Sequence, residues 1–169
     1  IHVDYEQCSK LERELLRALL LHELAHSKLH GSPYYYIIPV WSSLVEKYGE
    51  RAPIIAYLAS VVVKDVEVIA LLKSLGYERE IMAYTRLLDS ELPQEECFDI
   101  EDMLNFAKLL VPHVVMSLTV SSQQLRGVCR DALKRVEGIL AYILESRGTL
   151  DDKVRILVGM VEDLLRARQ

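Results

Sequence analysis

Apolar residues recur at helical spacing along almost the whole of the 169-residue chain. Apolar positions three and four residues apart are typical of amphipathic α-helices, whereas strict alternation of apolar and polar residues indicates a strand. Only residues 1–6 alternate in this way, which predicts either one short N-terminal strand or a frayed end. We therefore expect an all-α or nearly all-α fold of five to seven helices, with at most that one strand.

Cap residues and helix-breaking residues divide the pattern into segments. Ser9 and Glu12 form a capping-box sequence at the start of the first helix, and Asp99 and Thr149 are expected to cap two later helices. Gly31 is expected to end the first helix as a left-handed cap. The predicted helices cover approximately residues 10–30, 41–48, 53–75, 77–90, 99–120, 122–147 and 149–168.

The polar and acidic segment 91–97 is the best candidate for a linker. It would separate residues 1–92, which carry the candidate chemistry, from residues 93–169, a helical bundle. We expect the two regions to pack together as one compact unit. The C-terminal helices would form an assembly or partner-binding layer, including contacts between copies in a homo-oligomer.

The composition narrows the possible functions. The net charge of −5 argues against nucleic-acid binding, and the uncharged apolar runs 53–63 and 109–120 are too short to span a membrane. The cysteines, Cys8, Cys97 and Cys129, are odd in number and far apart, so we expect no disulfide framework and a reducing, cytoplasmic location. A single asparagine and many charged residues suggest a thermophilic source.

The most specific motif is His-Glu-x-x-His at residues 22–26. On a helix, His22 and His26 are about 40° apart and roughly 6 Å apart along the axis, so both imidazoles can hold one metal ion. Zinc accepts such nitrogen ligands and keeps one position open for water in catalytic sites, and Glu23 would act as general base on that water. The alternative is a core helix with two packed histidines and a solvated glutamate.

Residues 19–31 resemble the active helix of the zincin metallopeptidases, in particular the gluzincin type, in which a second helix some forty residues later supplies the third ligand. Segment 63–77 is similar to that helix in the HtpX and CAAX-protease class. Matched backward from Gly76, the family's ligand glutamate falls on Val63 and its aspartate on Asp65. The sequence His-Glu-Leu-Ala-His-x-x-Leu-His-Gly also resembles the ImmA/IrrE group of small metallopeptidases.

The third ligand is chosen among three residues. Asp65 has apolar residues at all of its helical contact positions, so it lies on a face that packs inward. Glu67 lies on a mixed face and is the alternative. His30 is rotated by about 80° from His22 and lies roughly 12 Å further along the axis, so it reaches the same ion only if the helix breaks.

The resemblance implies a zinc-dependent peptidase with a peptide or protein substrate. Zn²⁺ would be held by His22, His26 and Asp65, and Glu23 would serve as the catalytic base. Two other interpretations stay open: a degenerate zincin that binds metal without hydrolysis, and a non-catalytic helical interaction module. Residues 34–36, three tyrosines, and His113, in an apolar run, are more typical of packing than of catalysis.

Overall fold

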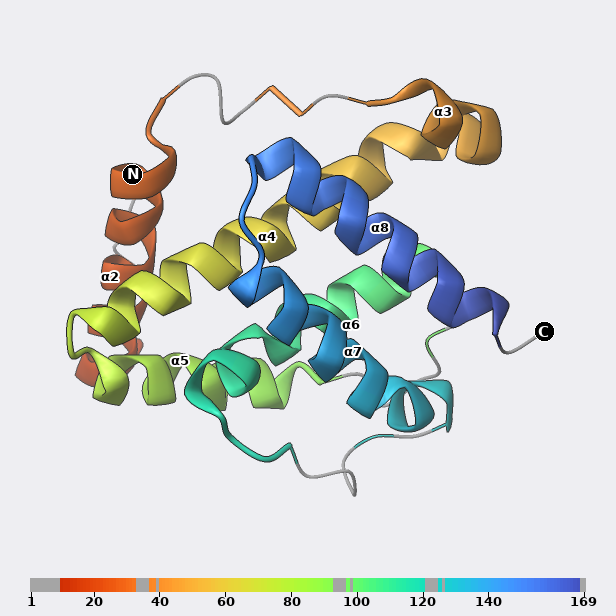
Figure 1. The fold of residues 1–169 in the computed structure, drawn as a ribbon. Coiled ribbons are helices and arrows are strands. Elements are labelled where there is room, and N and C mark those ends of the chain that lie inside the picture. The colour runs from red at the N-terminus through yellow and green to blue at the C-terminus, as the bar shows by residue number, and fades with distance from the viewer. Residues whose placement is uncertain are drawn as a thin grey trace.

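The computed structural model of the chain is helical throughout the part that it describes, namely residues 10–32, 37–38, 40–92, 97, 99–120, 125 and 127–167 (Figure 1). The helices are α2 (Arg13–His30), α3 (Ser42–Tyr48), η2 (Gly49–Arg51), α4 (Ala52–Ser74), α5 (Glu78–Ser90), α6 (Ile100–Met116), α7 (Gly127–Glu145) and α8 (Leu150–Arg166). These ranges contain no strand, which confirms the all-α fold. The predicted strand at 1–6 and the tyrosines at 34–36 lie outside the described residues.

Helix α4 is the centre of the fold. Figure 1 shows it running diagonally through the molecule, and it packs against α2, α6 and α8. Its 23 residues are mostly apolar and are buried on nearly all sides, as expected of a helix that is hydrophobic all round. Helix α4 also carries Asp65, which is buried, and Glu67, which is partly exposed.

Helix α2 is held between α4 and α5. An ion pair joins it to α5, with 2.9 Å between Arg17 Nε and Glu80 Oε1. The helix begins at Arg13, and its N-cap residue Glu12 makes no capping hydrogen bond through its side chain. The predicted capping partner, Ser9, lies outside the described residues.

The prediction of a left-handed cap at Gly31 is wrong. Gly31 has φ −71° and ψ −7°, so the chain stays right-handed for one residue beyond His30. A glycine is nevertheless required there, because a Cβ atom would clash with the carbonyl oxygen of Ser27. The sequence signal was therefore correct for a helix end, but steric crowding and not a positive φ explains it.

Both predicted caps of the C-terminal helices are confirmed. Asp99 accepts hydrogen bonds from the backbone N–H groups of Glu101 and Asp102 at the start of α6, and Thr149 accepts one from Asp152 at the start of α8. Each is a reciprocal capping box. Helix α6 is shorter than predicted, because Ser117 takes up a left-handed conformation after Met116.

The cysteine prediction needs correction, because Cys97 and Cys129 form a disulfide with their Cα atoms 5.3 Å apart. Cys97 precedes α6 and Cys129 lies on α7, and the packing of α6 against α7 brings them together across 32 residues of sequence. Disulfides are typical of oxidising compartments and also of proteins inside hyperthermophiles. The cytoplasmic location stays a prediction, without the cysteines as support.

Among the described helices, none combines the length and the apolar character that a bilayer crossing requires. The two regions predicted from sequence, 1–92 and 93–169, touch through the contacts of α4 with α6 and α8. Their division into separate units stays a prediction.

Candidate metal centre

Three predicted ligands from two helices meet at one point. His22 and His26 lie one turn apart on α2, and their Nε2 atoms are 3.1 Å apart. Asp65 comes from α4, and its Oδ1 atom lies 3.0 Å from Nε2 of His26 and 3.5 Å from Nε2 of His22. The packing of α2 against α4 thus places two imidazole nitrogens and one carboxylate oxygen at the corners of a small triangle.

The separations within the triangle are close to those between the ligands of a zinc ion. Ligand atoms about 2.0–2.1 Å from a tetrahedral zinc ion are about 3.3–3.4 Å from one another. The three observed separations are 3.0, 3.1 and 3.5 Å. Among the described residues, no fourth histidine, cysteine or acidic side chain joins the group, and three protein ligands are typical of a catalytic rather than a structural zinc site.

Asp65 is suited to be the anionic ligand. Its side chain is only 6% exposed. Burial would raise the pKa of this carboxyl, but hydrogen bonds and positive charge from His22 and His26, when these rings carry a proton on Nε2, outweigh burial and lower the pKa to about 2. Asp65 is therefore ionised at neutral pH, as a metal ligand must be.

The donor triangle opens into a cleft of about 430 Å³. Glu23, the predicted base, is exposed and lines this cleft. The ring of Tyr84, from α5, lies 4.6 Å from that of His22. Burial, together with the negative charges of Asp65 and Glu23, raises the pKa of Tyr84, so its hydroxyl keeps its proton. Further lining residues are Tyr57, Lys64 and Lys108.

The two histidines differ in what their second ring nitrogen contacts. A histidine that binds metal through one nitrogen usually donates a hydrogen bond through the other, which fixes its ring. Nδ1 of His26 lies 3.2 Å from Nδ1 of His30. Nδ1 of His22 is buried and has no hydrogen-bond partner. The ring of His22 lies against that of Tyr84 instead.

Two residues considered as third ligands lie outside the triangle. Oε2 of Glu67 is 3.0 Å from Nε2 of His30, and the other carboxylate oxygen accepts a hydrogen bond of 2.8 Å from Lys153. Since both oxygens of Glu67 point at these partners, the geometry favours Asp65. His30 is the last residue of α2 and lines the cleft, where its Nδ1 atom meets that of His26, but it is not one of the converging donors, so the helix does not break to bring it to them.

Sequence analysis did not identify the contributions of Tyr84, Lys108 and Lys153. These residues come from α5, α6 and α8, and no local motif marks them. Only the crossing of these helices over α2 and α4 brings them to the site. The C-terminal helices therefore add side chains to the cleft and its surroundings, in addition to any role in assembly.

Comparison of the chain with protein-family models, with curated proteins and with solved structures gives no match. The fold and the site together define an all-α protein with a candidate site of two histidines and one carboxylate. The resemblance to zincins, which depends on a short motif, stays a prediction.

Proposed function

We propose that the protein is a zinc-dependent metallopeptidase. The observation that carries this proposal is the donor triangle of His22, His26 and Asp65, which faces a cleft lined by the exposed carboxylate of Glu23. Neutral imidazoles and an ionised carboxylate are the donors that zinc accepts in hydrolytic sites. A cleft of about 430 Å³ is within the range of small-ligand sites, and a short peptide segment is our proposed occupant.

Each residue has a distinct role in this proposal. His22, His26 and Asp65 would hold the ion. When bound, zinc would supply Lewis acidity and lower the pKa of a water molecule towards 7. Glu23 takes a proton from the attacking water and passes it to the leaving amine. Tyr84 keeps its hydroxyl proton and so offers a hydrogen bond to a carbonyl oxygen in the cleft.

A second candidate function is metal binding without hydrolysis. The described residues include no strand beside α2, whereas zincins use an edge strand there to bind extended substrate, and Val63 replaces the usual glutamate. The third interpretation, a helical interaction module without metal, leaves the convergence of three zinc-type donors without a role. One experiment separates all three.

The test replaces Glu23 with glutamine. The Glu23→Gln variant should bind zinc as the parent does, because Glu23 is outside the donor triangle. Its hydrolysis of a peptide library should fall by about 10²–10⁴-fold, the contribution typical of a general base. Zinc content is measured by elemental analysis, and cleavage by mass spectrometry of the library.

Glu46→Gln is the matched control, since Glu46 is an exposed glutamate on α3 and does not line the cleft. It should leave both zinc content and cleavage unchanged. Undiminished cleavage by Glu23→Gln would show that Glu23 is not the base. A parent that binds zinc and cleaves nothing would favour metal binding without hydrolysis, and a parent that binds no zinc would favour the interaction module.

A further inference from the structure

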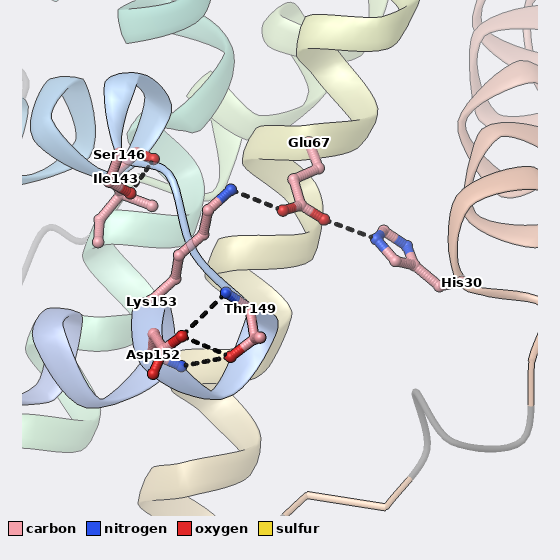
Figure 2. Close-up of polar contacts among 7 residues, drawn as sticks. All are labelled: His30, Glu67, Ile143, Ser146, Thr149, Asp152 and Lys153. Carbon is pink, nitrogen blue, oxygen red and sulfur yellow. Dashed lines mark hydrogen bonds and ion pairs between the residues drawn. The ribbon is translucent and has the colours of Figure 1, made fainter.

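His26 is the inner end of a chain of polar contacts that runs away from the donor triangle. Its Nδ1 atom lies 3.2 Å from Nδ1 of His30, and Nε2 of His30 lies 3.0 Å from Oε2 of Glu67. Lys153 donates a hydrogen bond of 2.8 Å to Oε1 of Glu67. Figure 2 shows the outer links, in which Glu67 on α4 stands between His30 of α2 and Lys153 of α8.

When the rings of His26 and His30 are neutral, the outer end of the chain fixes the direction of every hydrogen bond in it. An ammonium group only donates and a carboxylate only accepts, so Nε2 of His30 must donate to Glu67. A neutral imidazole has one N–H, and therefore Nδ1 of His30 is an acceptor. Nδ1 of His26 must then donate to it, which leaves Nε2 of His26 without a proton.

This tautomer directs a nitrogen lone pair at the carboxylate of Asp65, 3.0 Å away. Three polar contacts link the carboxylates of Asp65 and Glu67 through the rings of His26 and His30, and each contact needs a proton or a cation between its two atoms. The two neutral rings supply one proton each, which satisfies the contacts His26–His30 and His30–Glu67. The contact between Asp65 and His26 therefore lacks a positive charge, and Nε2 of His22 converges on the same place.

We propose that His30 and Glu67, anchored by Lys153, are positioning residues that hold His26 in the tautomer whose unprotonated Nε2 faces the cation site. This inference rests on the proposed metal site. Neither His30 nor Glu67 touches the ion in this arrangement. They orient the ring of His26 and fix its proton on Nδ1, as hydrogen-bond partners of metal-bound histidines do.

The surroundings of the chain are suited to this role. The side chains of His30 and Lys153 are 5% and 12% exposed, so water competes little for these hydrogen bonds. Lys153 extends from the first turn of α8, directly after the capping box of Thr149 and Asp152 shown in Figure 2. A capped helix start thus presents Lys153, which anchors the carboxylate of Glu67.

The tautomers can be read directly. Long-range ¹H–¹⁵N correlation spectra of the ¹⁵N-labelled 169-residue chain, recorded near neutral pH without metal and again with zinc, distinguish protonated from unprotonated ring nitrogens. We expect His30 to be protonated only at Nε2 in both states, and zinc-bound His26 only at Nδ1. A proton on Nδ1 of His30 in either state, or on Nε2 of His26 with zinc bound, would overturn the inference.

Zinc affinity gives a second readout, measured by competition with a chromophoric chelator. His30→Leu removes the acceptor for His26 and should weaken zinc binding by about 10–100-fold, the range for loss of such a partner. His30→Asn keeps an acceptor near the position of Nδ1 and should restore most of that loss. Equal losses in both variants would contradict a positioning role.

His113→Leu is the matched control, because His113 is also a buried histidine bonded to a carboxylate, with 3.1 Å between its Nε2 atom and Oδ1 of Asp89. It should leave zinc affinity unchanged, and an equal loss there would count against a specific role of His30. If the parent binds no zinc at all, the proposed function fails while the tautomer of His30 in the metal-free protein still decides this inference. If His30→Leu does not fold, the spectra of the parent decide it.

Discussion

Helices α2–α5 and helices α6–α8 are stabilised by different local means. None of α2, α3, α4 and α5 has a side-chain hydrogen bond at its N-cap. Helices α6 and α8 both begin with reciprocal capping boxes, and the disulfide Cys97–Cys129 joins the start of this half to α7. The donor triangle lies in the first half. The half that carries the candidate metal site therefore has no side-chain N-cap on its helices, whereas the capping boxes and this disulfide lie in the other half.

Two buried histidines, one from each half, differ in the residues that they contact. His22 and His113 are both buried, and each has an Nδ1 atom without a hydrogen-bond partner. His113 contacts one carboxylate, that of Asp89, whereas His22 meets both His26 and Asp65. A histidine paired with a single acidic residue is an ordinary structural contact. The convergence of three donor atoms is what distinguishes a candidate metal site.

The largest expected effect is the loss of stability on removal of the disulfide in the C-terminal half. Replacing both Cys97 and Cys129 with alanine should lower the free energy of unfolding by about 3–4 kcal/mol, because the bridge closes a loop with a sequence separation of 32. Zinc affinity should stay the same, since neither cysteine is one of the donors. Urea unfolding and chelator competition measure the two quantities.

Cys8→Ser is the control for the disulfide, because Cys8 is not part of this bridge. It should change neither stability nor zinc affinity. If loss of the bridge weakened zinc binding as much as it weakened the fold, the two halves would be coupled and their division of roles would be wrong.

Much of the fold could be predicted because its signals are local. The capping sequences at Asp99 and Thr149 begin helices where expected, and α3 ends at Tyr48, the last residue of the predicted segment 41–48, followed by Gly49 with φ 57°. The disulfide could not be predicted, because spacing along the chain does not reveal that α6 and α7 pack together. Gly31 was identified as a helix end, but the steric reason for glycine there depends on the carbonyl of Ser27 and was not visible.

The candidate site was predictable to the same extent. Helical geometry alone places His22 and His26 on one face, and the apolar surroundings of Asp65 in the sequence identify it as a buried carboxylate. The structure brings these three together. The links from His26 through His30 and Glu67 to Lys153 depend on how α2, α4 and α8 cross, so no sequence pattern contains them.

The second-largest expected effect is the loss of stability in acid that results from protonation of Asp65, the buried carboxylate of the first half. The pKa of Asp65 is lowered from 3.8 to about 2, so Asp65 stabilises the folded state above pH 4, and this contribution is lost as the pH falls from about 4 to 2. At 1.36 kcal/mol per pKa unit, the contribution is about 2 kcal/mol. The metal-free parent should lose this amount over that range, measured by urea unfolding at several pH values.

Asp65→Asn is the control, because an amide does not titrate in this range. Its free energy of unfolding should fall less steeply with acid than that of the parent, by the same 2 kcal/mol. If the free energies of unfolding of the parent and of Asp65→Asn changed in parallel with pH, charged or hydrogen-bonding neighbours would not stabilise the ionised carboxylate of Asp65. The cluster around His22 would then not differ from the simple pair of His113 and Asp89 in the other half.

The smallest effect tests the contrast in capping itself. Thr149→Ala removes the side-chain oxygen that caps α8 and should cost about 1 kcal/mol, the usual value for loss of an N-cap. Glu12→Ala at the N-cap of α2 should cost almost nothing, because the side chain of Glu12 makes no capping bond. Denaturant unfolding of both variants measures the difference. Equal losses would mean that α2 is capped in solution and that the two halves are stabilised alike. A loss confined to Thr149→Ala would show that the segment presenting Lys153 to Glu67 depends on its cap, whereas the helix that carries the histidines depends on packing against α4 and α5.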